Sequence, residues 1–397
     1  MRVCLIYDCL FPWTVGGAER RMGHLAERLA QQGHDVTYLT RCQWPPDEPP
    51  QLPGVRVIAV SRDEPLYGAD GNRTIGEPLR FGAGVLRHLL AHGREYDVVH
   101  TASFPYFSML AAGAARRRGG YRLIADWHEV WSASYWRRYV GGPQGRVAHA
   151  IQRTCARLPH TAFTFSRLHA ERLTDEGLRS EPRIIWEEWA DDARMALASA
   201  DGPRAADTRV EATTVPRSPS VVFAGRLITE KQAPRAVEAI VLAARQVSGL
   251  TGTIFGDGPE RALVDATIER LDARDVVVAP GFVEPEILQA AMRDALCLLA
   301  PSRREGYGLV VIEAAALGVP IVLAAGPDNA ATELVDAGVN GVVSQSDDAR
   351  ALADAIVEVH ARGARLRAST LAWHTAHLQR VAAQDPLREI LAAYAGR

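Results

Sequence analysis

Short apolar runs alternate along the chain with amphipathic stretches, and this pattern predicts the secondary structure. RVCLIYD reads as a buried strand, and ERRMGHLAERLAQQG as a helix whose apolar residues recur at helical spacing until Gly33. The further strands expected in this part are HDVTYLT, VRVIAV, YDVVHTA and YRLIADWHE, with helices near 79–92 and 107–118. Apolar strands that alternate with helices indicate a parallel sheet covered on both faces.

The alternation stops at a polar stretch rich in Pro, Ser, Thr and Ala and then resumes, which predicts two doubly wound α/β domains. We expect a Rossmann-like domain at 1–197, a linker at 198–219, a second Rossmann-like domain at 220–372 and a helical segment at 373–397. The strands of the second domain are expected at SVVFAG, LTGTIFGDG, VVVAPGF, LCLLAPS and PIVLAA. Ligands of such sheets bind outside the carboxyl ends of the strands, and two such edges can face one cleft.

The composition is that of a soluble globular protein, with 47% hydrophobic and 23% charged residues in a chain of 397. No apolar run approaches the roughly 20 residues of a membrane span, and MRVCLIYD is too short for a signal-peptide core. The five cysteines lack C-x-x-C spacing, which favours reduced thiols in a cytoplasm over disulfides or a zinc site. The net charge of −2 argues against a strongly basic nucleic-acid-binding protein.

Two glycine-containing loops that follow expected strands have two interpretations each. Gly16 and Gly17 precede the first helix, where either an anion meets backbone N–H groups or the chain simply turns. The order is not G-x-G-x-x-G and the second strand does not end in an acid, so a nicotinamide-dinucleotide site is not expected. In FGDGPE, Gly256 and Gly258 are equally consistent with a structural turn and with a ligand contact.

AGRLITEK brings two cations, Arg226 and Lys231, to the carboxyl edge of the first strand of the second domain. A guanidinium and an ammonium group together suit a diphosphate. The alternative is a pair of solvated surface charges. Lys231 is the only lysine among the 45 Lys and Arg residues, so a chain that otherwise uses arginine keeps a lysine at this position.

The stretch PSRREGYGLVVIEAAALGVP predicts a loop up to Gly308 and a helix that ends before Gly318. Gly306 and Gly308 let the backbone approach a ligand closely at the positive end of the helix. Glu305 precedes that end, and Glu313 is expected one turn into the helix in apolar surroundings. An unpaired carboxylate there would cost several kcal/mol, which either the vicinal hydroxyls of a sugar or an arginine could offset.

The combination of a GGAER-like loop, GRL..EK, GDGP and E-G-Y-G-L-x-x-x-E-A-x-A-x-G-x-P resembles glycosyltransferase family 4. The resemblance covers most of the chain and is closest in the second domain. It implies an α/β protein of GT-B fold, with two Rossmann-like domains facing a central cleft. It makes 1–197 the acceptor side and 220–372 the nucleotide-sugar side, and it implies that the segment 373–397 crosses back to the first domain.

The resemblance also implies roles for individual residues. Glu305 would face the donor sugar, Glu313 would bind the ribose, and His128, in IADWHEVW, would contact the sugar unless it is merely a core histidine. The residues expected to bind the donor are Gly16, Gly17, Arg226, Lys231, Gly256, Gly258, Phe282, Val283, Glu305, Gly306, Tyr307, Gly308, Leu309 and Glu313, with His128 and Glu305 as the catalytic residues. Within this set Arg226 and Lys231 would hold the diphosphate, and Phe282 and Val283 would meet the base.

One departure qualifies this resemblance. Where relatives often have Asn-Gly-Val-Asp, this chain has IIWEEWADDA, in which only Asp191 matches. The absence of any Asp-x-Asp agrees with a metal-independent reaction. The segment 133–142, ASYWRRYVGG, reads either as an acceptor-side helix or as a weak contact with a membrane surface.

We therefore expect a cytoplasmic retaining glycosyltransferase, either soluble or peripherally associated with a membrane. It would move a sugar from a UDP- or GDP-linked donor to an acceptor hydroxyl without a metal or cofactor. The sequence does not identify the acceptor, which is expected to be a small molecule, a saccharide or a lipid-linked molecule. The alternatives are a nucleotide-sugar 2-epimerase of the same fold and a non-catalytic nucleotide-sugar-binding protein.

Overall fold

The chain divides into two compact units in the computed structural model, which describes residues 1–14, 16–45, 47–65, 74–188 and 219–396. The first unit comprises Met1–Glu187 together with Pro386–Arg397, and the second comprises Glu188–Asp385. The expected linker at 198–219 lies, apart from its last residue, outside the described residues. The boundary between the units falls on the peptide bond after Glu187.

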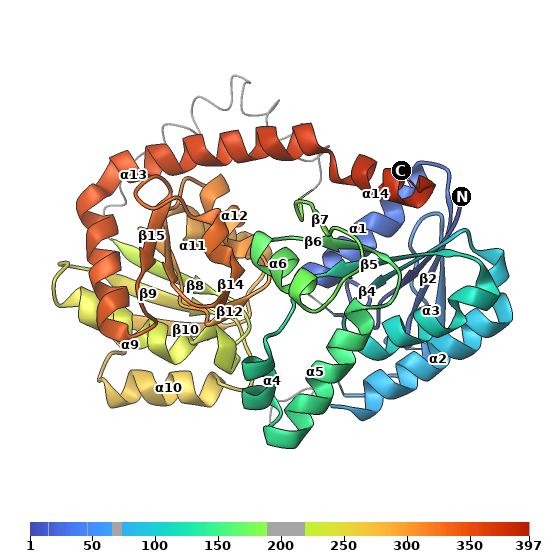
Figure 1. The fold of residues 1–397 in the computed structure, drawn as a ribbon. Helices are drawn as coiled ribbons and strands as arrows, with labels where there is room; N and C mark the ends of the chain where they lie inside the picture. Colours follow the sequence, from blue (N-terminus) through green and yellow to red (C-terminus); the bar gives the residue numbers. More distant parts are fainter. Residues whose placement is uncertain (15, 46, 66–73, 189–218, 397) are drawn as a thin grey trace. The chain divides into compact units, whose positions relative to one another are not determined.

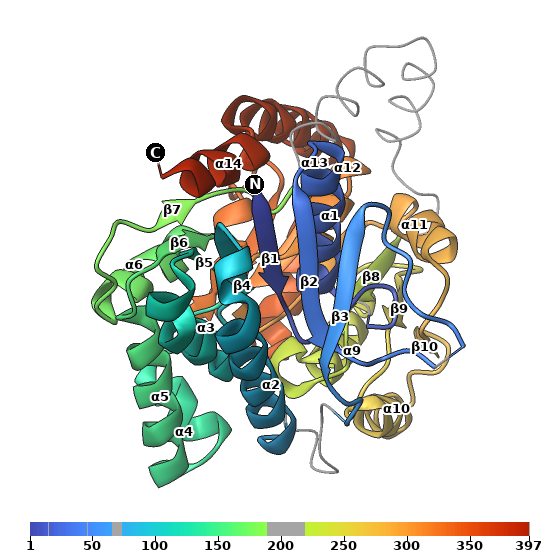
Figure 2. The same cartoon turned by 90° about the vertical axis from the view of Figure 1, so that its right-hand side faces the viewer.

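The first unit contains a parallel sheet that has seven strands within the described residues, in the order β3-β2-β1-β4-β5-β6-β7. Figure 2 shows α2 and α3 on one face of this sheet and α1 on the other. The strands are β1 (Arg2–Ile6), β2 (Asp35–Arg41), β3 (Val55–Ser61), β4 (Val98–Ala102), β5 (Arg122–Trp127), β6 (Thr161–Thr164) and β7 (Arg183–Ile184). The helices are α1 (Gly17–Gln31), α2 (Gly76–His92), α3 (Tyr106–Gly119), α4 (Ala133–Tyr139), α5 (Gly142–Ala156), α6 (Arg167–Asp175) and α14 (Pro386–Ala395).

The second unit contains a parallel sheet of six strands among the described residues, in the order β10-β9-β8-β11-β13-β15, and a small sheet formed by β12 and β14. Figure 1 labels β8, β9, β10, β12, β14 and β15 of this unit and the helices around them. The strands are β8 (Ser220–Ala224), β9 (Thr251–Phe255), β10 (Val277–Gly281), β11 (Cys297–Ala300), β12 (Arg304–Glu305), β13 (Ile321–Ala324), β14 (Asp328–Asn329) and β15 (Gly341–Ser344). The helices are α9 (Ala233–Ala244), α10 (Arg261–Arg270), α11 (Pro285–Arg293), α12 (Leu309–Ala316) and α13 (Ala349–Gln384), with short 3-10 turns η2 (Thr229–Lys231) and η3 (Ala330–Leu334).

Both large sheets are doubly wound. In each sheet the strand order reverses after the first strand of the unit, because β1 pairs with both β2 and β4, and β8 pairs with both β9 and β11. Ligands of open α/β sheets bind at such reversal points, outside the carboxyl ends of the strands. The expected fold of two Rossmann-like α/β units is therefore present, and it directs attention to the loops after β1, β5, β8 and β11.

The C-terminal part of the chain is a long helix with one sharp bend. Helix α13 bends at Gly363, whose φ of 51° and ψ of −135° are not helical. It then continues to Gln384, beyond the expected crossing point at Trp373, because nothing stops it before Asp385 and Pro386. Trp373 Nε1 donates to Asp336 Oδ2 at 2.7 Å and ties this segment to the second unit. Among the described helices, none combines the length and apolar character needed to cross a bilayer.

Candidate functional site

The glycines of FGDGPE serve backbone packing between two loops. Gly256 has a φ of +125°, and a Cβ on it would lie 1.9 Å from the carbonyl oxygen of Gly225. Gly258 has a φ of +153°, and its Cβ would lie 2.5 Å from the carbonyl oxygen of Leu227. The loops after β8 and β9 therefore touch through bare backbone, which only glycine allows. This contact explains both glycines as structural, and their contact with a donor stays a prediction.

Two motifs that are far apart in the sequence meet at the carboxyl ends of the neighbouring strands β8 and β11. Lys231 Nζ donates to Glu305 Oε2 at 2.5 Å, and the two side chains are 24% and 18% exposed. A second ion pair joins Arg304 to Glu230 at 3.7 Å. The GRL..EK loop and the EGYG loop are thus held together by paired opposite charges, and Lys231 and Glu305 are presented side by side.

Arg226 and Phe282 also lie at this edge of the second unit. Arg226 follows β8 and is exposed. Phe282 follows β10, and although it is an aromatic residue it is 70% exposed. Val283 beside it is partly buried. An exposed phenyl ring offers a flat apolar face on which a nucleobase can stack.

Helix α12 begins at the glycine that the sequence places there. Gly308 precedes the helix with a φ of +107°, and a Cβ on it would lie 2.8 Å from Ala331 Cβ. Both facts demand glycine and bring the chain close to η3. The first backbone N–H groups of a helix have no partner within it, so this end is suited to bind an anion. Within the loop before it, the pair of residues Arg304–Glu305 forms the short strand β12, which the sequence did not predict.

Glu313 corrects one expectation from the sequence. The prediction of apolar surroundings is wrong, because Glu313 is exposed. Helix α12 buries Val311, Ile312, Ala314 and Ala315 instead. The helix is therefore covered on one side only, and its small apolar residues made it read as buried all round. No burial cost has to be offset at Glu313, and its role at a ribose rests on the family resemblance alone.

In the first unit, His128 directly follows β5. Its Nδ1 lies 3.3 Å from Glu187 Oε1, and its ring stacks on Phe165 with centroids 4.7 Å apart and planes 14° apart. The His128 side chain is 22% exposed. Its Nε2 is buried and makes no hydrogen bond within the described residues, so this nitrogen is the one left for a ligand. A histidine with a purely structural role in the core would not need this carboxylate partner.

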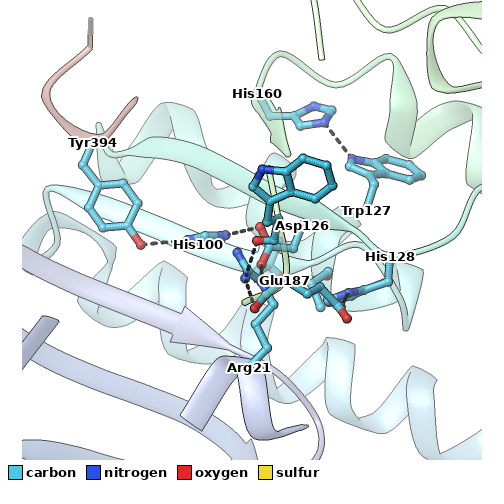
Figure 3. A network of polar contacts seen from close by, with 11 residues as sticks. Arg21, His100, Asp126, Trp127, His128, His160, Glu187 and Tyr394 are labelled. Atoms are coloured by element: carbon cyan, nitrogen blue, oxygen red, sulfur yellow. Dashed lines mark hydrogen bonds and ion pairs between the residues drawn. The ribbon is translucent and has the colours of Figure 1, made fainter. Parts of the chain in front are cut away.

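A buried polar network lies beneath His128 (Figure 3). Asp126 Oδ2 is 3.4 Å from Arg21 Nε, and Asp126 Oδ1 is 2.9 Å from His100 Nε2. His100 Nδ1 in turn lies 2.7 Å from the Tyr394 hydroxyl of α14. Burial alone would raise the pKa of Asp126, but the charges of His100 and Arg21 and the hydrogen bond from His100 outweigh it and hold that pKa well below its usual range.

The charge on Asp126 sets the direction of the hydrogen bonds that its carboxylate makes. An ionised carboxylate only accepts, so His100 Nε2 carries the proton that it donates to Asp126. Burial raises the pKa of Tyr394, so its hydroxyl keeps its proton, and it is hydrogen-bonded to His100 Nδ1 as a neutral group. The network fastens the C-terminal helix α14 to β4 and β5 within the first unit, directly beside the loop that carries His128.

Gly16 and Gly17 lie where helix α1 begins. Gly16 has an extended backbone that any residue could adopt, with a φ of −171°. A Cβ on Gly16 would, however, lie 2.3 Å from Glu19 Oε2. The carboxylate of the GGAER motif therefore folds over the start of α1, and Gly16 leaves room for it. The N-terminus of α1 already faces a negative group, so its contact with a donor stays a prediction.

Several residues with structural importance for the site were missed from the sequence. Asn329 is buried, donates at 3.0 Å to the carbonyl oxygens of Ser302 and Ala324, and accepts from the Ala331 N–H. It thus holds the loop that follows β11 against η3. Glu187 and Glu188 lie in the stretch that departs from the family pattern, and that departure was the available signal. Asp191 of the same stretch lies outside the described residues.

Within the described residues, no group of three or more His, Cys, Asp and Glu side chains is arranged to hold a metal ion. All five cysteines are described and are free thiols. The expected site residues fall into two sets, each within one unit. Gly16, Gly17 and His128 lie in the first unit, and the others follow β8, β9, β10 and β11 in the second.

Comparison with known proteins agrees with this division. The family "Glycosyl transferase 4-like domain" matches residues 16–185, and "Glycosyl transferases group 1" matches residues 207–368. The D-inositol 3-phosphate glycosyltransferase of Xylanimonas cellulosilytica is 31% identical over 371 residues, which are 90% of this chain and 87% of that protein. Such relatives are transferases, so an epimerase and a non-catalytic binding protein are not favoured.

Solved structures share the fold across the whole chain. The sucrose-phosphate synthase of Thermosynechococcus elongatus has a TM-score of 0.74 at 20% identity and covers 99% of both chains. HepE of Anabaena, solved with UDP-glucose, has a TM-score of 0.69 at 17% identity over 99% of this chain and 100% of that chain. This chain therefore belongs to glycosyltransferase family 4 and is a glycosyltransferase of GT-B fold that uses a nucleotide-sugar donor.

Proposed function

We propose that this enzyme transfers a sugar from a UDP- or GDP-linked donor to an acceptor hydroxyl with retention at the anomeric carbon and without a metal ion. The observation that carries the proposal is the contact between Lys231 and Glu305, since it joins a cation suited to a diphosphate with a carboxylate suited to sugar hydroxyls. The donor would lie along the carboxyl edge of β8 and β11, with its diphosphate at the start of α12.

Departure of the nucleoside diphosphate is the step that the second unit would assist. The leaving diphosphate gains negative charge in the transition state, so fixed positive groups stabilise that state more than the bound substrate. Arg226, Lys231 and the backbone N–H groups of Gly308 and Leu309 would supply this charge. With these groups in place, the reaction needs no metal ion to neutralise the leaving group.

Two side chains, Glu305 and His128, would contact the sugar during the transfer. Glu305 would accept hydrogen bonds from the sugar hydroxyls, while His128, oriented by Glu187, would contact the sugar near the reacting carbon. The acceptor hydroxyl would attack from the face that the diphosphate leaves. Glu313 would accept hydrogen bonds from the ribose, for which its exposed position on α12 is suitable.

The chemical class of the donor has more support than the identity of the acceptor. The complex of HepE with UDP-glucose supports a donor of this chemical class, and the exposed ring of Phe282 would stack on its base. For the acceptor we propose a hydroxyl of a small molecule, a saccharide or a lipid-linked molecule, reached from the first unit. We also propose that the reaction takes place in the cytoplasm, with the segment 133–142 on the acceptor side.

The proposal is tested first by a thermal-shift screen of nucleotides and nucleotide sugars, since a ligand of the native state raises its melting temperature. The stabilising donor is then incubated with candidate acceptors, and the anomeric configuration of the product is read by NMR. We expect retention, and a rate that EDTA leaves unchanged. An inverted product, or strong EDTA inhibition that magnesium reverses, would contradict the mechanism. Epimer formed from the donor alone would instead identify an epimerase.

A further inference from the structure

Two adjacent glutamates, Glu187 and Glu188, stand at the boundary between the units, in the stretch that departs from the family pattern. The Glu187 side chain belongs to the first unit, where it contacts His128. The Glu188 side chain belongs to the second unit, where it contacts two residues that are more than a hundred positions away in the sequence. These contacts of Glu188 have no part in the roles considered above.

The Glu188 carboxylate accepts one hydrogen bond on each oxygen. The Tyr307 hydroxyl donates to Oε2 at 2.6 Å, and His377 Nε2 lies 2.6 Å from Oε1. The His377 side chain is fully buried on α13 and stacks on Trp373 at a centroid distance of 5.3 Å. Burial would raise the pKa of Glu188, but the hydrogen bond and charge of His377 and the hydrogen bond of Tyr307 outweigh it and lower that pKa. The carboxylate is therefore ionised at neutral pH and accepts strongly.

Tyr307 is the residue through which Glu188 reaches the donor loop. It lies between Gly306 and Gly308, which have no side chains to fix the path of the loop. Its ring is buried, with only 5% of the residue exposed. The side chain thus points into the protein and is fixed at its tip, while its backbone continues into Gly308 and the first N–H groups of α12. Anchoring this hydroxyl fixes where those N–H groups lie.

We propose that Glu188 is a positioning residue for the donor loop Glu305–Leu309, and that it acts through the Tyr307 hydroxyl to set the affinity for the donor's diphosphate. This inference rests on the proposed function of that loop. The loop is then fixed at three successive points. Glu305 pairs with Asn329 in the β12–β14 sheet, Tyr307 is hydrogen-bonded to Glu188, and Gly308 packs on Ala331.

The test compares Glu188→Gln, Tyr307→Phe and the double variant. A hydrogen bond to a charged group corresponds to about a tenfold change in a binding constant or more. We expect the donor KM to rise about tenfold in each single variant, with kcat changed much less. We expect the double variant to match the single variants, because both substitutions weaken the same hydrogen bond, one by neutralising its acceptor and the other by removing its donor. Glu358→Gln, which breaks only the exposed pair with Arg362 on α13, is the matched control.

Two results would overturn the inference. A residue with a merely structural role would lower the active fraction, so that kcat falls while the donor KM stays unchanged. Additive effects of the two substitutions would mean that Glu188 does not act through Tyr307. Tyr307→Phe removes a single oxygen atom, so it keeps the test decisive if Glu188→Gln fails to fold.

A second measurement separates this inference from the proposed function. Hydrogen–deuterium exchange of the peptide around 304–312 reports the loop directly and needs no ligand. We expect faster exchange there in Glu188→Gln and Tyr307→Phe, and unchanged exchange in Glu358→Gln. If the wild-type protein bound neither UDP nor GDP, the proposed function would be refuted, but the exchange measurement would still test whether Glu188 anchors the loop. Unchanged exchange in both variants would refute the anchor whatever the wild type binds.

Discussion

Replacing Lys231 with methionine removes the ammonium group from the carboxyl edge of β8 but keeps a long apolar stem. Lys231 is paired with Glu305 at 2.5 Å, and both side chains are partly exposed. Because solvent screens such a pair, its loss should cost about 1 kcal/mol of folding stability or less. The variant should therefore fold, so that its binding defect can be measured.

The expected loss of binding is larger than the loss of stability. A hydrogen bond between the ammonium group and a phosphate is worth about 1.5–3 kcal/mol, which weakens the Kd by about 10- to 150-fold. Removing the lysine also leaves the Glu305 carboxylate facing the diphosphate without a counter-charge. This repulsion adds to the loss, so we expect a value in the upper part of that range.

Isothermal titration calorimetry with UDP and GDP measures this effect on the diphosphate alone, because neither ligand contains the sugar that is transferred. The double variant Lys231→Met/Glu305→Gln should bind more tightly than Lys231→Met alone, since the repelling carboxylate is gone. Arg270→Met removes an exposed cation that pairs with Glu238 on α9, and it serves as the control for a general charge effect. If Lys231→Met binds the nucleotide as tightly as the wild type, Lys231 does not hold the diphosphate and the reasoning fails.

Three further outcomes are expected. Glu305→Gln should lower turnover with the fold intact, and a wild-type kcat in a steady-state assay would remove Glu305 from the site. Phe282→Ala should weaken nucleotide binding by about 0.5–1.5 kcal/mol through lost stacking without a change in melting temperature, because the ring is 70% exposed; unchanged affinity by calorimetry would mean that no base stacks there. Asp126→Asn should destabilise the protein by about 3–5 kcal/mol in denaturant titrations, since it removes a buried carboxylate charge that Arg21 and His100 both contact. The pKa of Asp126 is depressed in the folded state, so its stabilisation is present above about pH 4 and declines as the pH falls further; wild type and variant should therefore converge in acid, and a constant difference down to low pH would contradict the ionised state of Asp126.

The alternation of apolar strands and helices was sufficient to predict two doubly wound sheets, because strands of parallel sheets are buried on both faces and read as continuous apolar runs. The start of α12 at Gly308 and its end before Gly318 were also predictable, since glycine marks both ends. The exposure of Glu313 was not. A short helix rich in alanine and valine has the same composition whether one side or both sides are covered, so only the packing around α12 decides it.

The donor-side residues could be recognised because the chemistry of a diphosphate restricts the choice of residues. Only a few kinds of group bind a diphosphate, namely cations, glycine-rich backbone and the start of a helix, and these groups recur at fixed positions after strands. The supports of these residues follow no such rule. Tyr307 and His377 contact Glu188 although they lie 119 and 189 residues away from it in the sequence. Another side chain of similar size that carried a hydrogen-bond acceptor could replace Glu188 there. Such contacts leave no local pattern in the sequence.

The arrangement of these supports has a consequence for how the donor loop responds to change. Asn329 and Glu188 come from different parts of the second unit and hold the chain around the two glycines of the loop at Ser302 and at Tyr307. His377 acts one step further away, because it holds Glu188. Loosening one contact therefore leaves the loop held by the others, and the loop shifts rather than unfolds. Substitution of Glu188 or Asn329 should for this reason alter donor affinity even though neither side chain is proposed to touch the donor.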